Sequence, residues 1–250
     1  MMTLFTEKCI FNPQKIINKN YMFEQNREPV QTVSKVGLEP TFMGKVMTFF
    51  ALAVFASSIG AYVTVRYFLT YFITNPVLMY ILFAAELVII FTAHWWKQSA
   101  PLNKVLFFAF AAITGITIAP LLGVLVQTPE GLSIVIKALF TTGLMFTATA
   151  IFAWTTKYDL SGLRGFLFMG LIGMIITSVV GIFIPWGSTF EIVFTGLGVI
   201  LFAAYTMYDI QQLKKYPEDA YIDAAMQLYL DIFNLFLYIL RLLMALSNRD

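Results

Sequence analysis

Long runs of apolar residues, separated by short polar segments, dominate this chain from residue 42 onward. A helix needs about 20 mostly apolar residues to cross the hydrocarbon core of a bilayer. Seven segments meet that requirement: Val46–Val65, Pro76–Trp95, Val105–Val126, Ala138–Thr155, Phe166–Trp186, Ile192–Asp209 and Ile222–Leu246. The pattern predicts an all-α polytopic membrane protein, with a bundle of seven transmembrane helices in residues 42–250.

The first 41 residues lack such runs. They are polar and mixed in charge, without the apolar core of a signal peptide. We expect them to form a mostly disordered cytoplasmic tail. Composition supports a membrane location for the rest, since 59% of the chain is hydrophobic and only 12% is charged, against roughly 25% charged residues in soluble domains.

The distribution of lysine and arginine predicts the orientation, because cytoplasmic loops of membrane proteins carry an excess of these residues. With the N-terminus in the cytoplasm, twelve basic residues lie inside and four outside. The inner group comprises six residues up to Lys45 and the pairs Lys97/Lys104, Lys157/Arg164 and Lys214/Lys215. Seven spans then place the C-terminus outside, unless the last helix only half crosses, which would leave that end inside.

A carboxylate interrupts the last apolar run. Asp231 would cost roughly 3 kcal/mol in a membrane on insertion scales, so it needs a partner, water or a proton. Asp209 lies 22 residues earlier, at the end of the preceding run. A helical hairpin folded at Lys214–Ala220 brings the two carboxylates to similar depth. Because two close carboxylates cannot cheaply both ionise, we expect the pair to share a proton and to titrate as a unit.

Asp231 also belongs to a polar stripe. Gln227, Asp231, Asn234, Tyr238 and Arg241 follow spacings of four and three residues, which places them on one face of a helix. A stripe of this kind is very unfavourable against lipid, so it must face other helices or water. Two interpretations stay open: interhelical hydrogen bonds that hold a bundle together, or a route for ions or protons. The carboxylate favours the route, because amides alone would serve to join helices.

The second apolar run carries Glu86 near its centre and Lys97 at its cytoplasmic end. Eleven residues are close to three helical turns, so both lie on one face about 16 Å apart. We expect Glu86 to be functional, and we expect Lys97 to be able to pair with a carboxylate at the cytoplasmic mouth. A lysine that merely extends its charged end into the interface is the more common case.

Composition disfavours several other functions. The net charge of +2 is small and scattered, which gives no basis for nucleic-acid binding. Cys9 is the only cysteine and His94 the only histidine. We therefore expect neither a thiolate cluster nor a histidine metal site, and no cofactor.

Two segments resemble the signature of the transmembrane Bax inhibitor motif family. They are Tyr205-Thr-Met-Tyr-Asp-Ile-Gln-Gln-Leu213 and Ala224-Ala-Met-Gln-Leu-Tyr-Leu-Asp-Ile-Phe-Asn-Leu-Phe236. The resemblance extends over about Phe42–Leu246. It implies a bundle of seven helices in which the last helix is central and enclosed by the other six.

The resemblance also implies a function. Prokaryotic members are associated with a pH-sensitive calcium leak, and some with modulation of a membrane protease. On this basis Asp209 and Asp231 form a pH-sensing gate that contacts calcium transiently, and Lys97 latches the pair. The implied ion pathway comprises Glu86, Asp231, Asn234 and Tyr238. Calcium is then the transported ion, and the expected location is a prokaryotic inner membrane.

Three function classes remain open. We favour a proton-gated cation leak, because carboxylates are the hard oxygen ligands that calcium prefers. The second class is an interaction protein that binds a membrane protease or another membrane complex. The third is an intramembrane aspartyl protease, since two aspartates lie on successive helices. The protease is disfavoured because Leu228–Leu230 precedes Asp231 where Gly-x-Gly would be expected, so we expect no enzyme.

The predicted orientation can be tested by cysteine labelling in intact cells, with Cys9→Ser as the background. Cysteines placed at Gly131 and Ser188 should react with an impermeant thiol reagent from outside, whereas one at Ser161 should not. The basis is the excess of basic residues on the expected inner side. Labelling at position 161 from outside would reverse the orientation.

Overall fold

The computed structural model describes residues 40–184 and 187–247. The chain divides into two units, residues 1–35 and 36–250, and all described residues belong to the second. The expected tail, residues 1–41, lies outside the described residues except for its last two, which begin the first helix. Every regular element in the described part of the chain is helical.

Seven helical segments within the described residues are long and apolar enough to cross a membrane, which confirms the predicted number. The first contains α2 (Pro40–Val63), the π-helical turn η1 (Thr64–Phe68) and α3 (Leu69–Thr74). The others are α4 (Pro76–Trp96), α5 (Leu102–Leu125), α6 (Pro129–Thr155), α7 (Arg164–Phe183), α8 (Ser188–Gln212) and α9 (Tyr221–Ser247). Short 3₁₀ turns adjoin α7, α8 and α9: η2 (Leu160–Leu163), η3 (Leu213–Lys215) and η4 (Glu218–Ala220).

The fourth span begins well before the predicted start at Ala138. The side chain of Thr128 accepts a hydrogen bond of 3.1 Å from the backbone N–H of Gly131, and Pro129 occupies the first helical position. Both features stabilise a helix start. The prediction from hydropathy missed this first part because Glu130 and Lys137 lower its apolar content.

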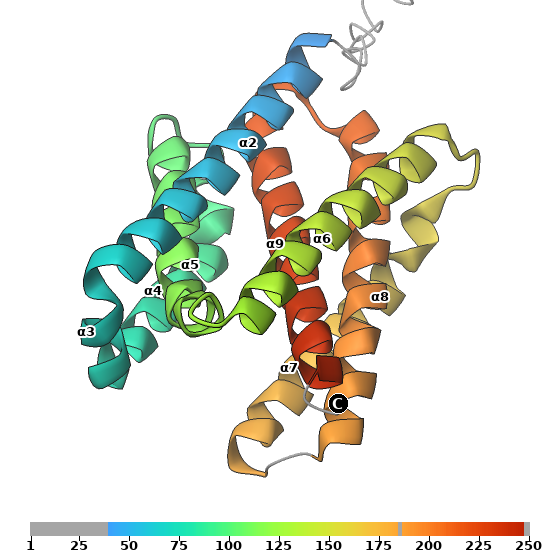
Figure 1. The fold of residues 1–250 in the computed structure, drawn as a ribbon. Coiled ribbons are helices and arrows are strands. Elements are labelled where there is room, and N and C mark those ends of the chain that lie inside the picture. The colour runs from blue at the N-terminus through green and yellow to red at the C-terminus, as the bar shows by residue number, and fades with distance from the viewer. Residues whose placement is uncertain (1–39, 185–186, 248–250) are drawn as a thin grey trace, which may run out of the picture. The chain divides into compact units, whose positions relative to one another are not determined.

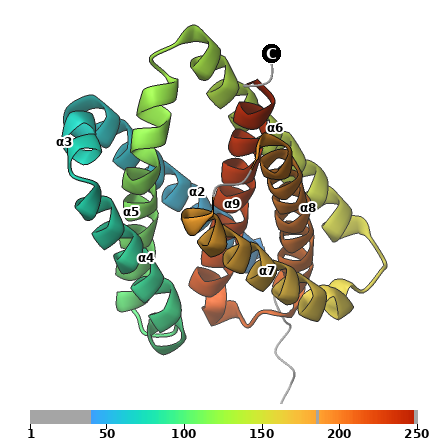
Figure 2. The same ribbon diagram turned by 90° about the horizontal axis from the view of Figure 1, so that it is seen from below.

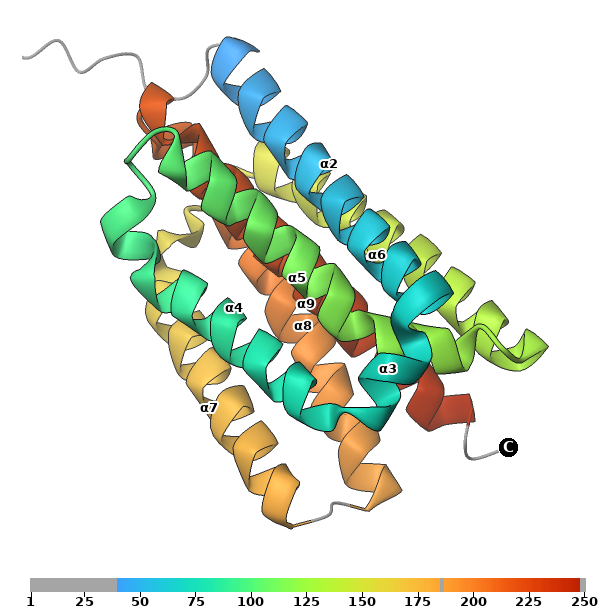
Figure 3. The ribbon, with the colours of Figure 1, turned by 90° about the vertical axis from the view of Figure 1, so that its left-hand side faces the viewer.

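The last helix, α9, is central. Helices α2, α5, α6 and α8 pack against it, as Figure 1 shows. This confirms the expected central position, although four helices and not all six form its principal contacts. In the outer positions, α4 packs principally against α5 and α7 against α8 (Figure 2 and Figure 3). The side chains of Leu228, Leu235 and Leu240 on α9 are fully buried, so apolar side chains along this helix pack against protein.

The outer helices expose large apolar side chains. Phe91 on α4 is 78% exposed and Phe183 at the end of α7 is 79% exposed. In water such a continuous apolar surface would be an aggregation liability. In a bilayer it is the surface that faces the acyl chains, so the exposure pattern agrees with a membrane-spanning bundle.

Helices α2 and α5 approach each other closely through small residues. A Cβ atom on Gly115 would lie 1.9 Å from the backbone oxygen of Ser57, and one on Gly60 would lie 2.6 Å from that of Ala112. Because these neighbours are backbone atoms, no side-chain rotation can relieve the clash. Small residues allow this kind of close backbone contact in membrane bundles, so α2 and α5 form a closely packed pair.

This contact predicts that Gly115→Leu will destabilise the folded protein by about 1–3 kcal/mol or more, as overpacking does. The midpoint of thermal unfolding in detergent, followed by fluorescence-detected gel filtration, measures the effect. Gly143→Leu on α6 is the matched control, because a Cβ atom there meets nothing within 4 Å. Equal midpoints for the two variants would show that the α2–α5 contact has room to adjust.

Candidate functional site

The hairpin of α8 and α9 brings the two predicted aspartates together. Asp209 lies one turn before the end of α8 and Asp231 lies in the first half of α9. The turns η3 and η4 fold α9 back along α8, and the two carboxyl groups are close enough to influence each other. The structure therefore places the two carboxyl groups at a similar depth, as we expected.

The environment of Asp231 constrains the pair. Asp231 is only 5% exposed, and its Oδ2 atom is buried without a hydrogen-bond partner among the described residues. A carboxylate oxygen accepts a hydrogen bond but cannot donate one. The two groups can therefore be hydrogen-bonded to each other only when one of them carries a proton.

Lys97 pairs with a different carboxylate from the one that the family resemblance implied. Its Nζ atom lies 2.8 Å from Oδ2 of Asp223, and both side chains are partly buried. The latch expected on the pair of Asp209 and Asp231 is thus replaced by an ion pair between α4 and the start of α9. The reason is positional: α4 packs principally on α5, away from α8, so its end reaches α9 before it could reach Asp209.

Asp223 connects this ion pair to a small polar network. Nε2 of Gln227 is 3.4 Å from Oδ1 of Asp223 and also donates to the hydroxyl of Tyr216. Burial raises the pKa of Tyr216, and the nearby charges of Asp223 and Asp209 act in the same direction. Its hydroxyl therefore stays neutral, so the charges within this small network are those of Asp223 and Lys97.

Two further residues of the polar stripe, Asn234 and Tyr238, are half-buried. The amide of Asn234 donates to the carbonyl of Leu230 at 2.8 Å, within its own helix. The ring of Tyr238 stacks on Phe202 with centroids 5.4 Å apart. It fits because position 198 on α8 is glycine, where a Cβ atom would lie 2.2 Å from that ring. Arg241 at the far end of the stripe is exposed.

Glu86 lies on another side of α9. It is buried on α4 and accepts a hydrogen bond of 2.8 Å from the hydroxyl of Thr117 on α5. On α9, Tyr229 faces α5, since its ring contacts Phe110. Tyr229 and Asp231 are two residues apart, or about 200° around the helix. The structure therefore does not bring Glu86 together with the aspartate pair.

Sequence reasoning missed three participants. Asp223 could have been found from the sequence, because it lies four residues before Gln227 and so continues the spacing of the polar stripe towards the start of α9. Tyr216 lies in the turn between helices, where periodicity carries no information. Thr117 was not linked to Glu86 because nothing in the sequence relates α4 to α5.

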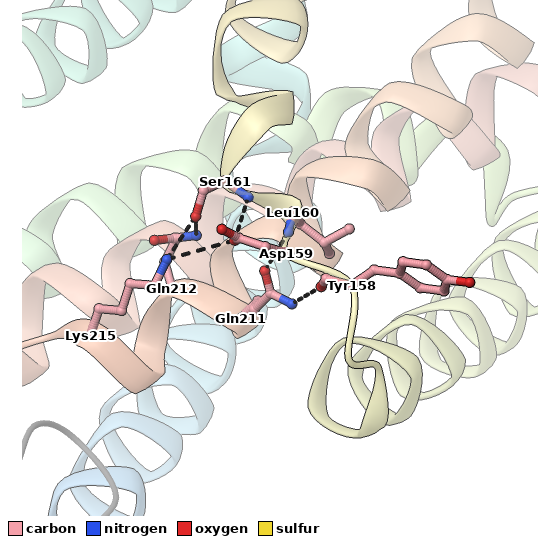
Figure 4. A network of polar contacts seen from close by, with 7 residues as sticks. All are labelled: Tyr158, Asp159, Leu160, Ser161, Gln211, Gln212 and Lys215. Atoms are coloured by element: carbon pink, nitrogen blue, oxygen red, sulfur yellow. Dashed lines mark hydrogen bonds and ion pairs between the residues drawn. The ribbon is translucent and has the colours of Figure 1, made fainter.

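A separate polar network joins the α6–α7 connection to the end of α8, as Figure 4 shows. The side chain of Gln211 bonds to the backbone on both sides of Asp159. Asp159 itself is exposed and lies 3.8 Å from Lys215. Hydrogen bonds from Ser161 hold the pKa of Asp159 below its usual value, so this carboxylate is ionised at neutral pH and separate from the buried pair.

Within the part of the chain that the structure describes, no three His, Cys, Asp or Glu side chains are grouped so as to hold a metal ion. Calcium takes six to eight oxygen ligands in a stable site. The aspartate pair alone offers too few oxygen atoms for such a site.

The fold and this site define a class of protein: a seven-helix integral membrane bundle whose central helix carries a buried carboxyl pair. Residues 39–249 match the family model described as inhibitor of apoptosis-promoting Bax1. The chain therefore belongs to the Bax inhibitor family.

Proteins from bacteria and yeast are similar to this chain in sequence. A protein of Campylobacter jejuni is 33% identical over 208 residues, which cover 83% of this chain and 90% of that protein. Bax inhibitor 1 of Schizosaccharomyces pombe is 29% identical over 229 residues, with 90% and 84% coverage. The inner membrane protein YbhL of Escherichia coli is 34% identical over 187 residues, with 68% and 75% coverage.

The observed ion pair predicts the outcome of two double-mutant cycles on unfolding stability in detergent. Lys97→Met and Asp223→Asn should show a coupling free energy of about 1 kcal/mol, as expected for a partly buried pair. Lys97→Met and Asp209→Asn should show coupling near zero. The reverse order of the two coupling energies would restore the latch that the family resemblance implied.

Proposed function

We propose that this protein is a pH-sensitive calcium leak of the inner membrane, gated by the pair of Asp209 and Asp231. The observation that carries the proposal is the pair of neighbouring carboxyl groups in which Asp231 is buried and its Oδ2 atom has no hydrogen-bond partner among the described residues. A structural polar contact would satisfy its buried atoms. A pair left one hydrogen bond short, where two helices meet, is suited to exchange a proton and to change partners.

The gate follows from charge. With one proton shared, the two carboxyl groups are joined by a hydrogen bond and hold α8 against α9. When that proton leaves, two negative charges face each other in a poorly solvated place, and repulsion favours separation of the helices. Asp223 adds a third carboxylate, which Lys97 neutralises. The leak should therefore rise as the pH rises through the value at which the shared proton dissociates.

The ion route proposed here runs beside α9 along Asp231, Asn234 and Tyr238, which share the side towards α8. Glu86, which the family resemblance also assigned to the pathway, lies on the α5 side of α9, where Thr117 donates to its carboxyl group, so the proposed route does not include it. Carboxylate, amide and hydroxyl oxygens are the groups that replace the water shell of a hard cation.

An alternative is an interaction protein that modulates a membrane protease or another complex, with the acidic pair in a structural role. The broad exposed aromatic surface of the outer helices supports this reading, because such a surface can face another membrane protein as well as lipid. The inner-membrane location proposed for this chain rests on the name of its relative YbhL.

Calcium flux into proteoliposomes of purified protein between pH 5 and 8 tests the leak. The wild-type leak should rise with pH, no more steeply than about tenfold per unit, which is the limit for one proton. Asp209→Asn and Asp231→Asn should each remove this rise, because neither leaves a pair that shares a proton.

Asp159→Asn is the matched control and should leave the curve unchanged, since Asp159 is exposed and already ionised over this range. If both single variants keep the wild-type midpoint, the gate is wrong. If pure liposomes show no flux at any pH, the interaction protein becomes the better proposal.

A further inference from the structure

The connection between α6 and α7 is fastened to the end of α8 by one amide side chain. Gln211 is 8% exposed. Its Nε2 atom donates to the carbonyl oxygen of Tyr158 at 2.7 Å, and its Oε1 atom accepts from the backbone N–H of Leu160 at 2.7 Å (Figure 4). One buried side chain thus satisfies two backbone groups that a turn leaves without partners.

Outer contacts join the same two segments. The hydroxyl oxygen of Ser161 accepts from Lys215 at 2.7 Å and from Gln212 at 3.3 Å. Lys214 donates to the carbonyl of Trp154 at 2.9 Å and lies 5.0 Å from its ring centroid. The two lysine contacts are exposed to solvent and are individually weaker. The two bonds of Gln211 are therefore the buried centre of this attachment.

The attachment holds α8 from the side opposite to α9. Gln211 follows Asp209 by two residues, which is about 200° around the helix. Asp209 faces Asp231 on α9, whereas Gln211 faces the α6–α7 connection. Helix α7 follows this connection directly and packs principally on α8. The connection, α7 and the end of α8 are thus linked both along the chain and through side chains.

We propose that Gln211 is a positioning residue that makes the α6–α7 connection and the end of α8 move as one body, and so holds Asp209 against Asp231. This inference rests on the proposed function, because the movement that it restrains is the separation of α8 from α9. While both bonds of Gln211 are intact, α8 can leave α9 only together with the connection and α7. The attachment therefore restrains the leak.

The test uses the full chain in lipid nanodiscs and Gln211→Leu, which keeps a similar side-chain size and removes both hydrogen bonds. Amide hydrogen exchange is followed in peptides that cover residues 156–163, 205–213 and 227–235. Exchange should become about tenfold faster in the first two, as expected for the loss of two buried bonds. It should also rise around Asp231, and the calcium leak of proteoliposomes at a fixed pH should increase severalfold.

Gln212→Leu is the matched control, because it removes a neighbouring amide that makes a single longer bond. Exchange and leak should both stay near wild type. Faster exchange confined to residues 156–163, with an unchanged leak, would overturn the positioning role. If exchange spreads to α8 and α9 while wild type carries no calcium at any pH, the positioning role stands and the leak function fails.

If Gln211→Leu does not fold, a reversible cross-link between the two segments tests the same proposal. Ser161→Cys and Gln212→Cys, with Cys9→Ser as the background, can be joined by a short cleavable reagent, since the native side-chain atoms lie 3.3 Å apart. Joining them should lower the leak severalfold and cleavage should restore it. A leak that is indifferent to the link would count against the attachment as a restraint.

Discussion

The burial of carboxyl groups where apolar helices meet is the constraint on which this structure depends. A buried charge in a membrane protein is costly unless it is paired, hydrated or neutralised. The bundle meets that cost in two ways at one end, with an ion pair between Lys97 and Asp223 and a neighbouring pair of carboxyl groups, Asp209 and Asp231, that can share a proton. The hairpin of α8 and α9 makes the second arrangement possible, because it brings Asp209 and Asp231 together.

Most of the fold was predictable, because every helix that crosses a bilayer needs an apolar segment of about the same length. The boundary at Ala138 was wrong because a helix can begin in polar residues when a cap such as Thr128 stabilises its start. The aspartate pair was also predictable, since a short turn between two long helices leaves one way to place them. The partner of Lys97 was not, because it depends on which helix α4 packs against, and spacing within one segment does not contain that information.

The central helix separates two polar environments that a single helical stripe does not reveal. Asp231 and Tyr238 face α8, whereas Tyr229 faces α5, the helix whose Thr117 donates to Glu86. Helical periodicity identified the first group correctly as facing protein. It could not relate Glu86 to either side, because that relation arises between α4 and α5. One helix therefore takes part in two sites whose chemistry is distinct.

The place of the carboxyl pair along the bundle has an electrical consequence. Moving one charge through the whole membrane is worth about 2.3 kcal/mol per 100 mV. Asp209 lies one turn from the end of α8, so a proton that reaches the pair from the nearer face crosses only part of that potential difference. The pair would then respond chiefly to the proton concentration on one face of the membrane and only weakly to the membrane voltage. A change in pH on that face would therefore alter the charge of the pair even at constant voltage.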